Sequence, residues 1–287
     1  MSIELRDGGL QVFDVDHGQC ALLTLPRAGG GVYRVMIDCG HAVDFKGAPW
    51  YPGQHLRSLG VKHIDLLIFT NYDEDHASGF PDLIARGITI GCILGNPSVP
   101  PELIVYLKSK TGMGKGIRKV AEVLAARRQA GQVEQAPVIP GLNLSYFWNP
   151  YPFFDDENNL SLVANLQIHG WNFLFPGDLE GKGWRNMLTT YPPFAAAAAR
   201  VHVLMAAHHG RESGRYPELF TAYNCKPRLV VISDDYKQFD TQETTSYYGS
   251  KASGIAWFRD GGPRKVLTTR DDKELRFSFS NGGILVG

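Results

Sequence analysis

An apolar segment of this chain ends in three carboxylates and a histidine. The run 64–69 is short and apolar, and Asp73, Glu74, Asp75 and His76 follow it closely. Carboxylate oxygens and imidazole nitrogens bind divalent metal ions in proteins. Ligands that come directly after a buried strand lie in a loop that a rigid sheet holds in place. The segment therefore predicts a metal site for one ion or for two neighbouring ions.

Two later segments show the same arrangement of an apolar run followed by metal-binding residues. Asp178 comes shortly after the run 172–175, and His208 and His209 follow the run 201–207. Neighbouring residues in extended chain point in opposite directions, so only one of the two histidines is expected to bind an ion. The sequence leaves open which one binds. The other histidine could donate a hydrogen bond or a proton to a leaving group.

The order of these motifs resembles the metallo-β-lactamase fold, and within it the branch related to the nuclease-like domain of the DNA-uptake protein ComEC. That branch begins with two strands that lead to glycine-containing turns, matched here by residues 12–20 and 35–40. It also carries an Asn-x-x-Ser-Leu-Val strand and a His-His-Gly motif, matched by residues 158–163 and 208–210. The resemblance covers roughly residues 8–235, and several motifs in a fixed order are more specific than any one of them.

The chain departs from this family pattern at the first position of the metal loop. That loop is usually His-x-His-x-Asp-His, or His-x-Asp-x-Asp-His in the ComEC-like branch, and here Asn71 replaces the first histidine. The neutral carbonyl oxygen of asparagine is a weak ligand for zinc. A histidine of the third motif is also absent, and Asn158 or Asn159 is nearest to its place. The metal ligands that we expect are Asn71, Asp73, Asp75, His76, Asp178 and His209.

This ligand set is rich in oxygen. It suits one tightly held ion, or a manganese-like or magnesium-like pair, better than a histidine-rich dizinc centre. We therefore expect a divalent metal cofactor, zinc or manganese, as one or two ions. Asp75 would bind the ion and accept a proton from water, assisted by His208 or His209. Asp38, which follows a buried strand, and Asn159 are expected to orient the ligands.

The elements that must position these residues recur in both halves of the chain. Short strands alternate with helical patterns, which is typical of an α/β protein with two packed sheets between layers of helices. The family resemblance implies the αββα four-layer sandwich as a single domain over residues 1–287, with one sheet from each half. The expected strands are residues 10–15, 21–25, 34–38, 64–69, 88–94, 161–168, 171–175, 202–206, 229–233, 266–269 and 275–279.

Residues 101–135 are expected to form a cationic helical insert within this domain. Apolar residues recur at helical spacing between 117 and 125, and seven lysines and arginines stand against three glutamates in the segment. The insert could line the cleft, where Lys115, Arg118 and Lys119 would bind a phosphate-bearing substrate such as nucleic acid. The alternative is a solvated helix face.

The composition is that of an ordinary soluble protein. The 287 residues are 44% hydrophobic and 20% charged, and 29 basic residues balance 29 acidic ones, so any attraction for nucleic acid must be local. The start of the chain lacks the apolar core of a signal peptide, and no stretch is long enough to span a bilayer. We expect a cytoplasmic protein that does not bind membranes. The four dispersed cysteines are expected to be reduced and buried.

The sequence thus leaves three functions open. The first is a metal-dependent hydrolase, specifically a phosphodiesterase or nuclease. The second is a hydrolase of a non-phosphate ester, a thioester or a lactam, as in other proteins of the fold. The third is a non-catalytic binding module with a degenerate metal site, an interpretation that Asn71 favours. Each motif taken alone is also typical of a solvated turn. Neither the substrate nor the oligomeric state follows from the sequence.

Overall fold

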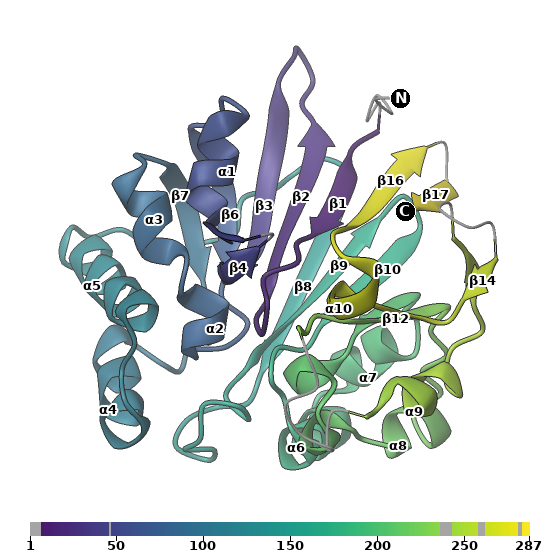
Figure 1. The fold of residues 1–287 in the computed structure, drawn as a ribbon. Helices are drawn as coiled ribbons and strands as arrows, with labels where there is room; N and C mark the ends of the chain where they lie inside the picture. Colours follow the sequence, from purple (N-terminus) through teal and green to yellow (C-terminus); the bar gives the residue numbers. More distant parts are fainter. Residues whose placement is uncertain (1–6, 46, 236–242, 258–261, 281–282) are drawn as a thin grey trace.

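Two β-sheets pack face to face at the centre of the molecule (Figure 1). The computed structural model describes residues 7–45, 47–235, 243–257, 262–280 and 283–287. The first sheet runs in the order β17 (Gly283–Val286), β16 (Leu275–Ser280), β1 (Gly9–Val12), β2 (Cys20–Pro26), β3 (Val32–Cys39), β6 (His63–Ile68) and β7 (Thr89–Leu94). The second runs in the order β15 (Val266–Thr268), β12 (Leu229–Ile232), β11 (Val203–Met205), β10 (Trp171–Phe175), β9 (Leu162–Ile168) and β8 (Leu142–Trp148).

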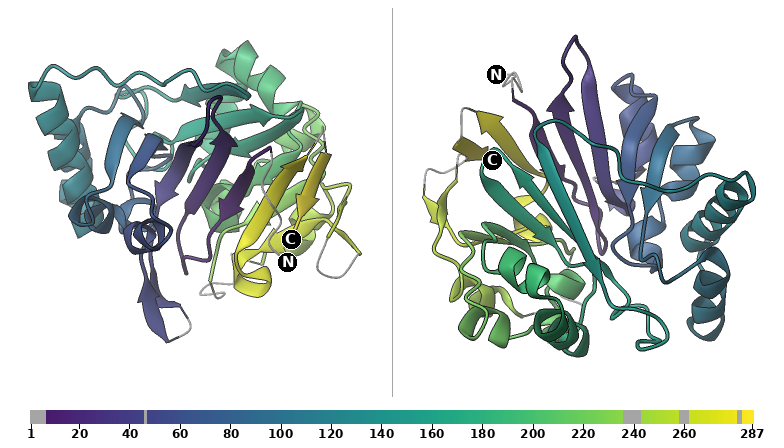
Figure 2. Two further views of the ribbon diagram at one scale, coloured as in Figure 1. Left: turned by 90° about the horizontal axis from the view of Figure 1, so that it is seen from above. Right: turned by 180° about the vertical axis from the view of Figure 1, so that it is seen from behind.

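Helices cover the outer face of each sheet (Figures 1 and 2). The first sheet carries α1 (Pro52–Ser58), α2 (Glu74–Ala77), α3 (Phe80–Ala85), α4 (Pro101–Thr111) and α5 (Lys115–Gln129). The second carries α6 (Gly181–Thr190), α7 (Pro192–Ala198), α8 (Glu218–Thr221) and α9 (Thr245–Gly249). This arrangement confirms the expected αββα four-layer sandwich.

The smaller elements lie at the margins of these layers. They are the β4 (Ala42–Phe45) and β5 (Ala48–Trp50) pair, the β13 (Ile255–Ala256) and β14 (Pro263–Arg264) pair, α10 (Thr269–Asp272), and the 3₁₀ turns η1 (Ala207–Gly210) and η2 (Glu212–Gly214).

The strands bury both of their faces because apolar residues occupy successive positions. In β2, Leu23 and Leu25 point into the core between the sheets, whereas Leu22 packs under the helices of the first sheet. Phe173 from β10 enters the central core from the opposite sheet. Side chains alternate across a strand, so an uninterrupted apolar run supplies two cores at once. The apolar runs in the sequence are therefore strands, as expected.

The division of the sheets between the halves of the chain differs from the expectation. The first sheet is not built from the first half alone, because the C-terminal strands β16 and β17 join it beside β1. Leu10 pairs with Phe277 in this register, and Phe277 enters the core between the sheets. Pairing with β16 covers the edge that β1 would otherwise present to solvent.

All four cysteines are free and buried. The insert over residues 101–135 forms the two helices α4 and α5. In the part of the chain that the structure describes, no helix is both long enough and apolar enough to cross a bilayer.

Candidate metal centre

Four of the predicted side chains converge where strands from both sheets end. They are Asp75, His76, Asp178 and His209, and one ligand atom from each lies within 4.8 Å of the others. We call these residues the four-residue cluster. His76, Asp178 and His209 are buried, whereas the side chain of Asp75 is 30% exposed. The cluster is therefore buried in the protein except at Asp75, which solvent can reach.

The loops that carry the cluster follow parallel strands. Asp75 and His76 lie in α2, directly after β6, and Asp178 follows β10. His209 lies in η1, which follows β11. The backbone N–H of His208 donates to the carbonyl oxygen of Gly177 at 3.0 Å, which joins the second and third of these loops. The carboxyl ends of the strands thus fix all four side chains.

Two glycines allow the backbone of Asp75 to approach the first sheet. A Cβ atom would lie 2.6 Å from the carbonyl oxygen of Asp75 at Gly18, and 2.4 Å from it at Gly40. Neither position has room for a side chain. The backbone N–H of Gln19 donates to the same oxygen at 3.3 Å. The glycine-containing turns near the start of the chain therefore help to position Asp75.

His76 is held between two carboxylates. Its Nδ1 lies 2.9 Å from Oδ2 of Asp38, and its Nε2 lies 3.1 Å from Oδ1 of Asp178. Asp38 is itself fixed by a hydrogen bond from the backbone N–H of Thr70 at 2.7 Å. A carboxylate on Nδ1 directs the Nε2 lone pair toward a metal ion. Asp38 thus contacts Nδ1 of His76 directly, and its role as a group that orients a ligand stays a prediction.

His209 presents an unsatisfied nitrogen to the cluster. Its Nδ1 donates to the carbonyl oxygen of Ser233 at 2.8 Å. Its buried Nε2 lies 3.2 Å from Oδ2 of Asp75 and 3.5 Å from Oδ1 of Asp178, yet it forms no hydrogen bond with any described residue. Buried polar atoms rarely lack a partner. A cation among these atoms would satisfy Nε2, so the residues present fit a metal ion.

The charges in the cluster also indicate a site for a cation. Burial would lower the pKa of His76, but Asp178, Asp38 and Asp75 raise it well above its usual value. Burial also opposes a charge on His209, whose pKa the carboxylates of Asp178 and Asp75 nevertheless raise. The excess of carboxylates thus draws protons onto both imidazoles. A divalent cation can replace those protons without a net change in charge.

The structure separates the roles of the two histidines. Both lie in the left-handed region, with φ of 53° at His208 and 52° at His209, so the expected alternation of an extended segment does not apply. His209 enters the cluster. His208 instead contacts groups outside the cluster, with its Nδ1 2.9 Å from Oγ of Ser213 and 3.2 Å from Oε1 of Glu180. Such backbone strain in non-glycine residues is characteristic of functional sites.

Asp73 and Asn71 do not act as the sequence suggested. Asp73 caps α2 and accepts a hydrogen bond from Nζ of Lys108 at 2.8 Å, so its carboxylate faces an ammonium group. Asn71 presents its amide nitrogen, which donates to Oδ2 of Asp178 at 2.9 Å. Its oxygen accepts from the backbone N–H of Tyr72 at 2.7 Å. Neither residue therefore offers a ligand atom to the cluster.

Asn159 also lies apart from the ligands that it was expected to orient. Its side-chain oxygen accepts from the backbone N–H of Gly183 at 2.9 Å, and its nitrogen donates to Asp156. It fixes the loop before β9. Asn158 is the asparagine beside the cluster, because its oxygen lies 3.4 Å from the amide nitrogen of Asn71.

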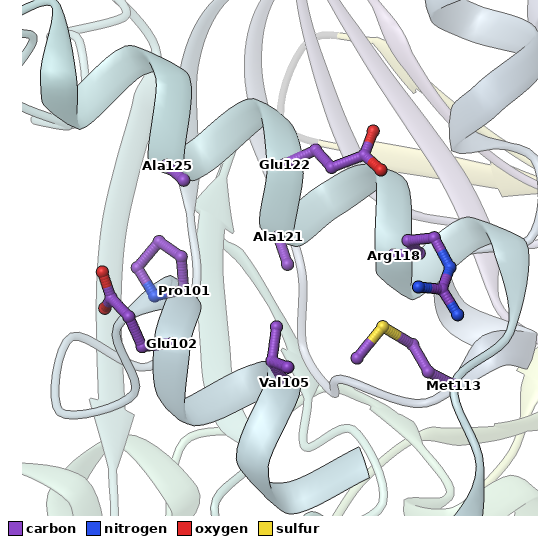
Figure 3. Close-up of a pocket in the computed structure, with 8 residues that line it drawn as sticks. All are labelled: Pro101, Glu102, Val105, Met113, Arg118, Ala121, Glu122 and Ala125. Atoms are coloured by element: carbon purple, nitrogen blue, oxygen red, sulfur yellow. The ribbon is translucent and has the colours of Figure 1, made fainter. Parts of the chain in front are cut away.

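The basic residues expected to bind substrate lie on α5. Lys119 pairs with Glu122 at 3.1 Å, and Lys115 is exposed. Arg118 lies at one end of a groove of about 290 Å³ between α4 and α5, near Met113 (Figure 3). No contact among the described residues joins these three basic side chains to the cluster.

Two residues beside the cluster escaped the sequence interpretation. The ring of His17 lies 5.4 Å from the ring of His209, and its Nε2 lies 3.1 Å from Nη2 of Arg211. Burial, together with the positive charges of His209 and Arg211, lowers the pKa of His17 to about 4. Both residues lie in or next to the motifs that carried the family resemblance. That proximity was the only signal for them.

Comparisons with known proteins give one curated relative and several solved structures. No family model matches the chain. ComE operon protein 3 of Bacillus subtilis is 24% identical over 245 residues, which are 79% of this chain but 28% of that protein. The chain therefore spans little more than a quarter of the length of this relative.

Solved structures resemble this one at low sequence identity. CmlA, a diiron beta-hydroxylase from Streptomyces venezuelae, is 12% identical with a TM-score of 0.50, covering 95% of this chain and 54% of that one. A metallo-beta-lactamase family protein from Thermus thermophilus is 15% identical with a TM-score of 0.35, covering 66% and 70%. The chain has the metallo-β-lactamase fold. Its similarity to ComE operon protein 3 supports a place in the ComEC-like branch.

Proposed function

We propose that this protein is a metal-dependent hydrolase that cleaves phosphodiesters. The four-residue cluster carries the proposal, because it offers two imidazole nitrogens and two carboxylate oxygens within 4.8 Å of one another at the end of both sheets. Mixed nitrogen and oxygen ligands suit zinc or manganese. The resemblance to a nuclease-like domain supports a phosphodiester substrate.

The candidate ligand atoms are Nε2 of His76, Nε2 of His209, Oδ2 of Asp75 and Oδ1 of Asp178. A divalent ion held there would supply Lewis-acid polarisation of the scissile group and make water more acidic. The protein contributes the orientation of these ligands. Asp38 fixes the ring of His76, and the carbonyl oxygen of Ser233 fixes the ring of His209.

Asp75 is the residue that we assign to proton transfer. Its side chain is 30% exposed, whereas the side chain of Asp178 is only 4% exposed, so Asp75 is the carboxylate that water can reach. The positive charges of His76 and His209 outweigh the effect of burial and lower the pKa of Asp75. Asp75 is therefore ionised at neutral pH, which both metal binding and proton transfer require.

The test is turnover of bis(p-nitrophenyl) phosphate and of single-stranded DNA by protein supplied with zinc or manganese. We expect Asp178→Asn and His209→Ala to reduce turnover by more than about hundredfold, since even groups that only orient a ligand contribute about ten- to hundredfold. Asp155→Asn, a change of the same kind at an exposed position, is the matched control. Equal turnover in all three variants would refute the proposal. Turnover of a neutral reporter ester alone would favour a non-phosphate substrate.

A further inference from the structure

We propose that Thr269 and Arg270, on helix α10, position the candidate ligand His209 through the loop that follows β12. The inference rests on the proposed function in one respect, namely that the four-residue cluster binds a metal ion. The contacts that carry it run from α10 to the loop and from the loop to His209, so Thr269 and Arg270 are positioning residues and not ligands. Both lie beyond residues 8–235, the stretch that carries the family resemblance.

Two neighbouring parallel strands bring the loop and α10 together. In the second sheet β12 pairs with β15, and Ile232 and Thr268, the last residues of the two strands, lie opposite each other. The carboxyl ends of parallel strands lie at the same edge of a sheet. Strands β10 and β11 run parallel to β12 and end at this edge as well. Residues 233–234 and α10 therefore meet at the edge where the cluster is formed.

Asp234 is held to α10 by its backbone and by its side chain. Its backbone N–H donates to Oγ1 of Thr269 at 2.9 Å, and the hydroxyl of Thr269 donates to its carbonyl oxygen at 2.8 Å. Nη1 of Arg270 donates to Oδ2 of Asp234, and these two side chains are 15% and 1% exposed. Removing one partner of a buried ion pair leaves the other charge without compensation. The position of Asp234 therefore depends on α10.

Ser233, the residue before Asp234, contacts both sides of the cluster. Its carbonyl oxygen accepts from Nδ1 of His209 at 2.8 Å. Its hydroxyl donates to the carbonyl oxygen of Gly18 at 2.7 Å, and Gly18 packs against the backbone of Asp75. The loop after β12 thus supports one candidate ligand directly and approaches the backbone of a second.

The peptide group between Ser233 and Asp234 links α10 to His209. This group is planar, so the N–H of Asp234 and the C=O of Ser233 belong to one rigid unit. Thr269 holds the N–H, and His209 donates to the C=O. A carbonyl oxygen on Nδ1 of a histidine fixes the orientation of the ring and leaves Nε2 for an ion. The contacts of α10 therefore determine where Nε2 of His209 points.

The two candidate histidine ligands are supported in different ways. His76 has the carboxylate of Asp38 on its Nδ1, at 2.9 Å. His209 has a backbone carbonyl group whose own position depends on α10. A change in α10 should therefore alter His209 and leave His76 as it is, which provides an internal reference within one protein.

The first experiment measures hydrogen exchange of the two Nδ1–H protons by NMR in the metal-free protein labelled with ¹⁵N-histidine. The signals are assigned by their loss in His209→Ala and in His76→Ala. In Thr269→Val and in Arg270→Gln we expect exchange at His209 to be at least about tenfold faster than in the wild type, and exchange at His76 to stay within about threefold. Unchanged exchange at His209, or the same increase at both histidines, would overturn the proposal.

The second experiment measures zinc affinity by competition with a chelator. We expect Thr269→Val and Arg270→Gln to lower the affinity about tenfold to hundredfold, as for the loss of a group that orients a ligand. Arg270→Lys keeps a positive charge beside Asp234 and should bind zinc with intermediate affinity. If Arg270→Gln does not fold, Thr269→Val decides the test, because valine keeps the shape of threonine and leaves the ion pair in place.

Arg127→Gln is the matched control for Arg270→Gln. Arg127 is 17% exposed, pairs with Glu134 and donates to backbone carbonyl groups of β7. The loss of this ion pair should change neither the zinc affinity nor the exchange at His209. Zinc affinity that is unchanged in Thr269→Val and Arg270→Gln, or that Arg127→Gln lowers to the same extent, would contradict the positioning role.

The two experiments separate this inference from the proposed function. If the wild type binds zinc and cleaves phosphodiesters, and both α10 variants match it in affinity and exchange, the inference is wrong and the proposed function stands. If the wild type binds no zinc, the proposed function is wrong, and the exchange at His209 in the metal-free protein still decides whether α10 positions this side chain.

Discussion

The two carboxylate oxygens of Asp178 face different surroundings. Oδ1 lies 3.1 Å from Nε2 of His76 and 3.5 Å from Nε2 of His209, two nitrogens that can bind a cation. Oδ2 accepts a hydrogen bond from the amide nitrogen of Asn71 at 2.9 Å. The first oxygen has a place for a metal ion beside it, whereas an N–H donor already occupies the place beside the second.

The same contrast extends to the neighbours of each oxygen. On the side of Oδ1, Asp38 and Ser233 orient the two imidazoles. Asn71 donates to Oδ2, and two residues further along the same loop the ammonium group of Lys108 holds the carboxylate of Asp73. The chain therefore keeps the ligands for one ion, whereas a hydrogen bond from the amide nitrogen of Asn71 occupies the second oxygen of Asp178 and an ion pair with the ammonium group of Lys108 occupies Asp73.

The largest predicted effect is the pH dependence of zinc affinity, which concerns the two histidines beside Oδ1 of Asp178. Because the carboxylates of the cluster raise the pKa values of His76 and His209, both rings lose their protons at a higher pH than a free imidazole, and they must lose them to bind an ion. Affinity therefore rises with pH, about tenfold per pH unit for each proton released, until the raised pKa values are passed. Zinc titrations in competition with a chelator between about pH 6 and pH 8.5 measure this slope. An affinity independent of pH would contradict the protonated cluster.

The stability of the metal-free protein should follow the opposite trend. A histidine with a raised pKa in the folded state stabilises the fold below its unfolded pKa of 6.5, and this contribution is lost as the pH rises through the folded value. The difference in Tm between zinc-loaded and metal-free protein should therefore increase with pH. Thermal unfolding at several pH values, with and without zinc, checks the direction.

Asp38→Asn tests the orientation of His76 on the same side. We expect zinc affinity to fall about tenfold to hundredfold, because Nδ1 of His76 loses its carboxylate partner. Asparagine tolerates the left-handed backbone at this position, where φ is 55°, so the fold should be retained. A chelator competition assay measures the affinity, and circular dichroism checks the fold. Unchanged affinity would show that Asp38 does not act through His76.

The double variant Asn71→His and Lys108→Gln tests the side of Oδ2 and should have the smallest effect. It replaces the donor beside Asp178 by an imidazole and releases the carboxylate of Asp73. We expect the zinc content at saturation to rise above one ion per chain, with the additional ion held more weakly than the first. The single variant Asn71→His should stay near one, since Lys108 still holds Asp73. A double variant that gains no zinc would show that other groups exclude the second ion.

Local patterns in the sequence predicted much of the fold and of the cluster. Apolar runs bury both strand faces, so the strands that precede Asp75, Asp178 and His209 could be located from the sequence alone. Strand β8 is absent from the expected strands, although alternate residues from Leu142 to Trp148 pack against the central core, because at this sheet edge none of its residues is fully buried. The place of β16 and β17 in the first sheet was missed as well, since the pairing of distant strands leaves no local signal.

The errors at the site have a common physical cause, which is contact between residues distant in sequence. Nothing near Asp73 indicates that Lys108 will hold its carboxylate, and nothing near Asn71 indicates which end of its amide faces Asp178. The choice between His208 and His209 depended on a backbone conformation that the sequence does not reveal. Only the tertiary structure shows which groups these side chains contact.

The metal content of the purified chain decides whether the four-residue cluster binds one metal ion. Protein saturated with zinc and then desalted can be analysed by inductively coupled plasma mass spectrometry at a known protein concentration. The contrast between the two oxygens of Asp178 predicts one tightly bound zinc ion per chain. Two tightly bound ions would contradict the roles given to Asn71 and Lys108, and a chain that retains no zinc would contradict the metal centre itself.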